Sequence, residues 1–315
     1  MEKKPLYKVL IRADASTQIG AGHIMRDLVL AKQFRDAQVS FATRNLDGNL
    51  DEHIKKSGFD VITLKSSAID ELVTVIQENG FDELVIDHYD IGYQEERYIK
   101  EKTGIKIFVI DDTYQQHECD ILLNHNVCAD QTRYYDLVPK YCEIRCGKEF
   151  TLLREEFYQV KKEPKEKNSD GLFHIFIGMG GTDPKNITTK LLDLLEDIPN
   201  LQIDVVTTHL NRNIHQLQQY ALRLKNCHVH INCDYIAKLI YHADLAIVTP
   251  SVIVNEVLFL ETPFLAIKTV DNQNEMYHYL KKNGYLIFDE FDKTELKNTI
   301  QSIVKESNVL NISSR

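Results

Sequence analysis

The chain has 315 residues, of which 43% are hydrophobic and 27% charged, so it is long enough for two domains with a core in each. Its formal net charge of −10 argues against a nucleic-acid-binding protein, because neutralising phosphates requires a basic surface. No apolar run is long enough for a signal peptide or a membrane span, so we expect a cytoplasmic protein without a membrane partner. We also expect a monomer with a small-molecule substrate.

Strand-like and helix-like segments alternate in the first half of the chain. Apolar, β-branched runs predict strands at residues 8–12, 39–42, 61–64, 83–86, 106–110 and 120–123, with helices between them, for example at 24–35, 69–79 and 95–103. This alternation predicts βαβ units and a parallel sheet. Several predicted strands end on polar residues, which places those side chains at the carboxyl edge of the sheet, where α/β proteins bind ligands.

The turn after the first predicted strand contains Gly20, Ala21, Gly22 and His23. The two glycines let the backbone approach a ligand closely, and the N-terminus of the next helix favours negative charge. His23 can move a proton near neutral pH. The turn therefore predicts a ligand site with His23 at its mouth, while a histidine that merely caps the turn is an equal alternative from position alone.

A polar, charged segment at residues 159–171, with Pro and Gly, predicts a linker between domains at 1–158 and 172–315. The alternation then restarts, with strands predicted at 173–177, 202–206, 228–231, 245–248 and 264–267 and a last helix at 294–305. We therefore expect two Rossmann-like, doubly wound α/β domains that face each other across a cleft.

The first turn of the second predicted domain contains Gly180, Gly181 and Thr182. Backbone amides and a hydroxyl at a helix start would suit a diphosphate, whereas the simpler alternative is an ordinary βα turn. Asp183 is expected to cap the helix, with Pro184 at its first position. No Walker lysine follows, so the turn is not a P-loop.

Six cysteines occur, none of them in a C-x-x-C pair, and we expect reduced thiols. The adjacent carboxylates Asp111 and Asp112 follow a strand and could hold magnesium, but one buried capping residue and one solvated residue is the simpler interpretation. We expect no metal site and no cofactor.

An ordered set of short blocks covers residues 8–285. The first block comprises residues 12–14 and 18–26, and the others are residues 86–89, 119–124, 145–147, 153–158, 179–183, 254–256 and 272–273. The run at 153–158 is hard to explain by the fold alone. Together these blocks resemble the PseG family of UDP-sugar hydrolases, which is related to the MurG-type glycosyltransferases of the GT-B fold.

The resemblance implies removal of UDP from a 2,4-diacetamido-2,4,6-trideoxy-altropyranose in pseudaminic acid biosynthesis, without a metal. In that reaction His23 would be the general base that activates water. Asp14 is a candidate to contact the sugar or the water, while a salt bridge to Asp14 is the simpler interpretation of Arg12. The Tyr89 hydroxyl could reach the sugar, and the neighbouring His88 is expected to be structural.

The same resemblance suggests how the second domain would hold UDP. Glu256 resembles the acidic residue with which GT-B domains hold ribose hydroxyls, although a solvated helix residue is a common alternative. Ser251 could contact phosphate, with Asn255 beside it. Asn272 and Gln273 could hold phosphate or sugar groups, or Asn272 could simply cap a helix.

Two other functions remain open. A glycosyltransferase of the same fold would replace water by an acceptor, and the product would distinguish it. A non-catalytic nucleotide-sugar-binding or epimerase-associated protein would bind UDP without releasing it from any UDP-sugar.

Overall fold

The computed structural model describes residues 6–165, 168 and 170–313, and it divides into two compact units, Met1–Leu153 and Arg154–Arg315. The boundary predicted at residue 158 falls inside α5 (Glu155–Lys162), which belongs to the second unit because it packs against α8 (Ile236–His242) of that unit. Residues 159–162 of the predicted linker therefore complete a helix. Its residues 166, 167 and 169 lie outside the described residues, as do residues 1–5 at the start of the chain.

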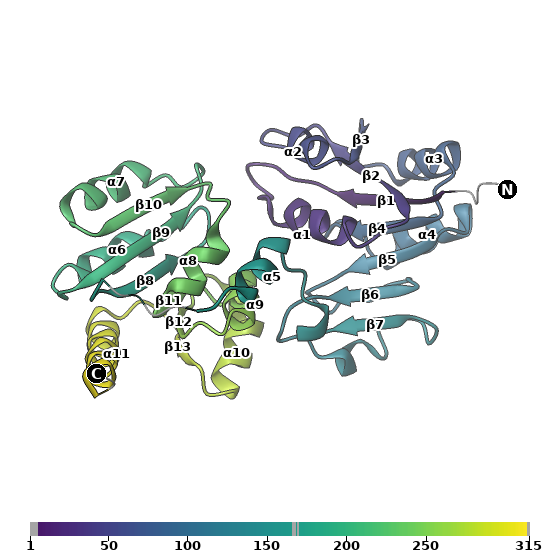
Figure 1. Ribbon diagram of the computed structural model, residues 1–315. Coiled ribbons are helices and arrows are strands. Elements are labelled where there is room, and N and C mark those ends of the chain that lie inside the picture. Colours follow the sequence, from purple (N-terminus) through teal and green to yellow (C-terminus); the bar gives the residue numbers. More distant parts are fainter. Residues whose placement is uncertain (1–5, 166–167, 169, 314–315) are drawn as a thin grey trace. The chain divides into compact units, whose positions relative to one another are not determined.

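The first unit contains a seven-stranded parallel sheet with the order β3-β2-β1-β4-β5-β6-β7 (Figure 1). Its central strands are nearly continuous buried apolar runs, as expected where helices cover both faces. The strands are β1 (Tyr7–Ala13), β2 (Ala37–Arg44), β3 (Asp60–Leu64), β4 (Glu83–Asp87), β5 (Lys106–Ile110), β6 (Ile121–Asn124) and β7 (Glu143–Cys146).

Helices pack on both faces of this sheet. On one face, α1 (Gly22–Ala31) and α2 (Asp51–Lys56) contribute Ile24, Leu28 and Ile54 to a core that includes Val9 and Val85. On the other face, α3 (Ile69–Asn79) and α4 (Tyr93–Thr103) contribute Leu72, Ile76 and Ile99 to a core that includes Leu10 and Leu84. Because strand side chains alternate between faces, residues of β4 with odd numbers face α1 and residues with even numbers face α3.

The second unit contains a six-stranded parallel sheet with the order β10-β9-β8-β11-β12-β13. Its strands are β8 (Phe173–Gly178), β9 (Leu201–Thr207), β10 (Cys227–Ile231), β11 (Leu245–Val248), β12 (Phe264–Ile267) and β13 (Leu286–Phe288). Its remaining helices are α6 (Ile187–Leu195), α7 (Ile214–Arg223), α9 (Val252–Phe259), α10 (Asn274–Lys282) and α11 (Lys293–Ser313).

The last helix belongs to the core of the second unit. Leu296, Ile300 and Val304 of α11 are buried in the cluster that also contains the apolar face of α6, which confirms the apolar stripe predicted for residues 294–305. The helix begins one residue before the predicted start and continues to Ser313. None of the helices that the structure describes combines the length and apolar character needed to cross a membrane.

In both parallel sheets the strand order reverses beside the first strand. The order places β1 next to β4 in the first unit and β8 next to β11 in the second, so each unit has the Rossmann strand order with a switch point at those pairs. The prediction of two doubly wound α/β domains is confirmed. The edge strands β7 and β13 were not predicted, because each is short and carries partly exposed side chains instead of a buried apolar run.

Candidate active site

The turn between β1 and α1 lies at the switch point of the first unit. Gly20 has a φ of +85°, and its amide donates to the carbonyl of Ser16 at 2.8 Å in an isolated antiparallel bridge. A residue with a Cβ atom would be strained at that φ, which explains this glycine. Ala21 precedes α1, and Gly22 is the first residue of that helix. His23 therefore lies in the first turn of α1.

His23 is held by a carboxylate from the neighbouring strand. Its Nδ1 atom lies 2.6 Å from Oδ1 of Asp87, the last residue of β4, and the imidazole side chain is 11% exposed. Arg26, one helical turn after His23, donates from Nε to Oδ2 of Asp87 at 2.6 Å and from a second nitrogen to Oδ1. One buried carboxylate therefore binds both a histidine and an arginine of the same face of α1.

The charges of this cluster decide the tautomer of His23. Burial alone would raise the pKa of Asp87, but the Arg26 charge and the hydrogen bonds from Arg26 and His23 outweigh it and hold that pKa well below its ordinary value. An ionised carboxylate only accepts hydrogen bonds, so Nδ1 of His23 carries the proton. The lone pair is then on Nε2, and the imidazole can accept a proton there.

Tyr89 packs beside the imidazole. Its ring meets the His23 ring edge-on, with centroids 5.0 Å apart, and its hydroxyl donates to Asp112 at 3.1 Å. Asp112 also lies 3.3 Å from Arg26, so it links Tyr89 to the same arginine that holds Asp87. Tyr89 is 66% exposed, which leaves much of this side chain open to solvent at the site.

Asp14 occupies a different environment. Arg12 donates to both of its oxygens at 2.8 Å, Arg44 donates from its backbone amide and from Nε, and Nε2 of His88 lies 3.1 Å away. Asp14 is 1% exposed, so both oxygens are occupied and shielded from solvent. The arrangement makes Asp14 a support of the turn, and the contact with sugar or water suggested by the sequence stays a prediction.

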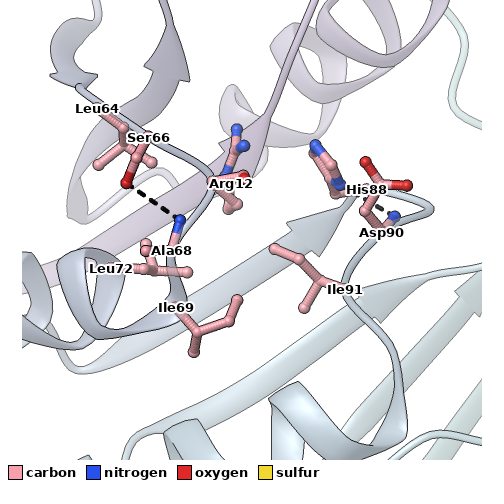
Figure 2. Close-up of a pocket in the computed structure, with 10 residues that line it drawn as sticks. Arg12, Leu64, Ser66, Ala68, Ile69, Leu72, His88, Asp90 and Ile91 are labelled. Atoms are coloured by element: carbon pink, nitrogen blue, oxygen red, sulfur yellow. Dashed lines mark hydrogen bonds between the residues drawn. The ribbon is translucent and has the colours of Figure 1, made fainter.

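His88 belongs to this support and lies on the α3 face. The backbone amide of Asp90 donates to Nδ1 of His88, so Nε2 carries the proton that points to Asp14, and the structural role expected for His88 is confirmed. Figure 2 shows Arg12 and His88 lining a small cavity near α3, with Ser66 and Leu72. Its volume of about 20 Å³ holds one water and is too small for a sugar.

Two further polar side chains are buried near Asp87 without a hydrogen-bond partner among the described residues. Asp27 of α1 is fully buried, and its burial and the Asp87 charge raise its pKa well above the ordinary value. His125, which follows β6, is also fully buried, and burial together with the Arg26 charge lowers its pKa to about 3. The low pKa of His125 leaves that imidazole neutral at pH 7, so it adds no positive charge beside Asp87.

In the second unit, the predicted diphosphate turn follows β8 at that unit's switch point. Gly180 is exposed with a φ of +87°, and Thr182 is exposed. A Cβ atom on Gly181 would lie 2.8 Å from a Thr208 methyl group, so only glycine fits there, and the Gly181 carbonyl accepts from the hydroxyls of Thr207 and Thr208. The turn is held from one side while Gly180 and Thr182 remain accessible.

Asp183 caps α6, but the helix begins later than predicted. Its carboxylate accepts from the amides of Ile187 and Thr188 at 2.9 and 2.8 Å, and α6 starts at Ile187, so Pro184 lies in the preceding turn and not at the first helical position. Asp183 and Asn186 both have positive φ values, so the segment before the helix is not helical. Because Asp183 already occupies the amides of the helix start, an anion at this turn would need the amides of Gly180 to Thr182.

The loops after β11 and β12 bring the remaining predicted residues to the same edge of the sheet. Ser251 precedes α9, with its Oγ 2.9 Å from the Thr249 hydroxyl, and Asn255 is buried in the helix. Glu256 is partly exposed and lies 3.5 Å from Arg154, and burial raises its pKa to about 7 against the opposing Arg154 charge. Because β8, β11 and β12 are adjacent, Glu256 and the Gly180 turn follow neighbouring strands.

Asn272 and Gln273 differ in their surroundings. Gln273 is buried, and its side-chain oxygen accepts from the amide of Thr269 at 2.8 Å, so it stabilises the turn after β12. Asn272 is exposed in the short helix Asp271–Gln273 and makes no side-chain cap there. A hollow of about 330 Å³ adjoins this turn, and its lining carries three lysines and three carboxylates, namely Lys185, Lys190, Lys268, Asp271, Asp289 and Glu290.

No group of three or more His, Cys, Asp or Glu side chains able to hold a metal ion occurs within the described residues. Asp111 is the buried capping residue expected, because its carboxylate accepts from the amides of Thr113 and Tyr114 and from the Tyr134 hydroxyl. Asp112 is not simply solvated, since it pairs with Arg26 and Tyr89.

The sequence analysis named both His23 and Tyr89, whose rings are in contact in the structure, but it did not single out Asp87, Arg26 or Asp112 as their partners. The sequence did contain a signal for Asp87 and for Arg26. Asp87 is an acidic residue at the end of a fully buried strand, and Arg26 lies three residues after His23 on the same helix. The pairing itself joins residues more than 60 positions apart, which local patterns do not reveal.

No family model matches the sequence. The chain is 44% identical over 279 residues to a UDP-2,4-diacetamido-2,4,6-trideoxy-β-L-altropyranose hydrolase of Campylobacter jejuni, a match that covers 88% of this chain and 97% of that protein. It is also 31% identical over 290 residues to an uncharacterized protein of Methanocaldococcus jannaschii, covering 87% of this chain and 58% of that longer protein.

Solved structures with the same fold include nucleotide-sugar proteins. MurG of Acinetobacter baumannii aligns with a TM-score of 0.62 at 14% identity, covering 95% of this chain and 91% of that one. The kitacinnamycin glycosyltransferase aligns with a TM-score of 0.69 at 12% identity (96% and 91%), and a UDP-GlcNAc 2-epimerase of Neisseria meningitidis with 0.59 at 14% (96% and 92%). At these identities the likeness shows the fold, which is GT-B-like.

Proposed function

This chain belongs to the PseG family of UDP-sugar hydrolases, and we propose that it hydrolyses UDP-2,4-diacetamido-2,4,6-trideoxy-β-L-altropyranose to the free sugar and UDP. The observation that carries the proposal is the similarity to the Campylobacter hydrolase over nearly its whole length. The pair of His23 and Asp87 at a switch point supports it, because a hydrolase of this kind needs a base beside the bond that breaks.

In the proposed reaction the first unit activates water. Nε2 of His23 takes a proton from a water molecule while the water oxygen bonds to the anomeric carbon of the sugar, and the bond from that carbon to the diphosphate oxygen breaks. Asp87 keeps the proton on Nδ1 and stabilises the imidazolium that forms. UDP leaves with the bonding electron pair, and the proton on His23 is then lost to solvent.

The second unit would hold UDP. Gly180, Gly181 and Thr182 would bind the diphosphate with Ser251 and Asn255 near it, and Glu256 would accept hydrogen bonds from the ribose hydroxyls. Asn272 would contact a phosphate or sugar group, and Gln273 would position its turn. The common position of these loops after adjacent strands supports this assignment.

The proposal also covers the pathway, the cellular location and the oligomeric state of the enzyme. The free sugar would serve pseudaminic acid biosynthesis in the cytoplasm, and the enzyme would act as a monomer without a nucleic-acid or membrane partner and without a metal. The net charge of −10 supports a small-molecule substrate over a nucleic acid.

A UDP-release assay tests the function. The purified protein is incubated with a panel of UDP-diacetamido-trideoxy sugars in the presence of EDTA and without any acceptor. We expect UDP and free sugar in equal amounts from the altropyranose substrate. UDP release only when an acceptor is added would indicate a glycosyltransferase, and UDP binding without release from any sugar would indicate a non-catalytic protein.

A further inference from the structure

We propose that Cys119 and Cys142 form an oxidisable dithiol, a site that a low-molecular-weight disulfide converts into an intramolecular disulfide bond. The Sγ atoms of these two residues lie 3.6 Å apart. Cys119 is fully buried ahead of β6, and Cys142 is half-buried immediately ahead of β7. The pair thus combines an accessible thiol with a buried one behind it.

The protein holds the two cysteine segments against each other on both sides of the thiols. The Tyr141 hydroxyl donates to Glu118 at 2.5 Å, and the amide of Glu143 donates to the Asp120 carbonyl at 2.9 Å. These contacts join the residues directly before and after each cysteine. They hold the two segments together where the sulfur atoms lie 3.6 Å apart, and a disulfide bond requires the sulfurs to approach to about 2.0 Å.

A lysine reinforces this contact. Lys100 donates to both oxygens of Asp120 at 2.9 Å and to the Tyr141 hydroxyl at 3.1 Å, so it bridges the two segments from α4. Three elements of the first unit therefore meet at the dithiol. The arrangement is independent of the candidate active site, because it lies at the amino ends of β6 and β7 and the His23 site lies at carboxyl ends.

The surroundings favour Cys142 as the first thiol to react. The hydrogen bond with the Cys119 thiol, helped by the nearby His117 charge, lowers the pKa of Cys142. Burial instead raises the pKa of Cys146 to about 11 and also raises that of Cys233. Cys142 is thus set apart from these half-buried cysteines as the better source of thiolate.

The reaction proceeds in two exchanges. The Cys142 thiolate attacks one sulfur of the small disulfide RSSR, which gives a mixed disulfide on Cys142 and releases RS⁻. Cys119 then loses its proton and attacks the Cys142 sulfur, which forms the Cys119–Cys142 bond and releases a second RS⁻. In sum, two protein thiols are oxidised, one RSSR is reduced and two RSH are formed. The bond would tie the edge strand β7 covalently to the start of β6.

The test uses the full-length protein and oxidised glutathione at pH 8, followed by intact mass and peptide mapping. We expect the loss of two hydrogen atoms and a cross-linked peptide that joins Cys119 to Cys142. Oxidation should raise Tm by on the order of 5–10 °C, reversibly with dithiothreitol, because the bond closes a loop in the unfolded chain. A protein whose mass does not change would overturn the proposal, and so would a cross-link to another cysteine.

Variants test which cysteine attacks the small disulfide first and which one then closes the protein disulfide. Cys119→Ala should stop the reaction at a glutathione adduct on Cys142, whereas Cys142→Ser should form neither adduct nor cross-link at either position. Cys146→Ser is the matched control, because it removes another half-buried thiol, at the end of the edge strand that Cys142 precedes, and it should cross-link as the unaltered protein does. A glutathione adduct that persists on Cys142 while Cys119 is present would contradict the proposal.

Discussion

The Nδ1 atom of His23 lies 2.6 Å from Oδ1 of Asp87, although 64 positions separate the two residues in the chain. The contact forms because the first turn of α1 stands at the end of β1, and β4 is the strand that pairs with β1 across the switch point. Arg26 completes the group by holding both oxygens of Asp87. These contacts define the tautomer of His23 and leave Nε2 as the atom that would take a proton in the proposed reaction.

Replacing His23 by Asn should remove most turnover and leave UDP binding intact. Asn cannot accept a proton as imidazole does, so kcat should fall by about 10²–10⁴. The measurement is steady-state UDP release together with calorimetric titration of UDP. His53→Asn, at an exposed position of α2, is the matched control and should keep normal turnover. Near-normal turnover in the His23 variant would remove it from the mechanism.

Replacing Asp87 by Asn should lower both kcat and stability. The amide can present its N–H group to His23 and so favour the wrong tautomer, and the loss of the negative charge leaves the buried Arg26 with Asp112, at 3.3 Å, as its ion-pair partner. We expect kcat to fall roughly 10²–10⁴-fold, with a lower Tm. Asp90→Asn, an exposed residue of the same loop, should change neither quantity. Equal kcat values in the folded Asp87 variant and the unaltered enzyme would contradict the proposed tautomer control.

Asp14→Asn distinguishes support from catalysis. Asp14 accepts hydrogen bonds from Arg12, Arg44 and His88 and has no exposed oxygen, so the variant should be destabilised by about 3–5 kcal/mol. Its kcat per folded molecule should stay within roughly tenfold of normal, because a support of the turn acts only through position. Urea unfolding gives the stability, and active-site titration with UDP gives the folded fraction. A normal stability with a loss of turnover comparable to that of His23→Asn would show that Asp14 acts directly on the sugar or the water.

Glu256→Gln tests the proposed ribose contact. At pH 8, above the Glu256 pKa of about 7, replacing the carboxylate by an amide should weaken UDP binding by roughly tenfold or more, because a hydrogen bond to a charged group contributes about 1.5 kcal/mol or more. Isothermal titration of UDP measures this change. Glu261→Gln, at an exposed position just after α9, should bind UDP normally. Unchanged affinity in the Glu256 variant would leave Glu256 as a structural partner of Arg154.

The buried His117 predicts how stability changes with pH. Burial opposes its charge, but the carboxylates of Asp111 and Glu96 outweigh burial and raise the pKa of His117 to about 9, and its Nδ1 lies 2.7 Å from Glu96. The folded state therefore binds the proton more tightly than the unfolded state does. The stabilisation should be complete below pH 6.5 and should be lost as the pH rises towards 9, by on the order of 3 kcal/mol.

Urea unfolding between pH 6 and pH 9.5 measures this dependence, and His117→Gln should flatten it. His174→Gln is a suitable control because His174 pairs with a partly exposed Asp170 in the other unit. An unchanged slope in the His117 variant would show that other groups carry the pH dependence.

The architecture could be predicted from the sequence. Apolar runs such as 8–12 and 106–110 are buried on both faces and could only be parallel strands under helices, and the position of His23 after the glycine turn followed from the same pattern. The short edge strands β7 and β13 were not predicted, because an edge strand of three or four residues need not be apolar throughout. The start of α6 was misplaced because Asp183 caps the helix from farther back than its spacing to Pro184 suggested.

The partners of the polar residues, in contrast, are visible only in the folded chain. Asp87 ends β4 and Asp14 directly follows β1, and the sequence analysis named Asp14, which is closer to His23 along the chain. The fold instead orients Asp87 towards α1 and surrounds Asp14 with Arg12, Arg44 and His88. The physical reason is that side chains of a strand alternate between the faces of the sheet, and the partner of each is set by strand order, which joins β1 to β4 across more than 60 residues.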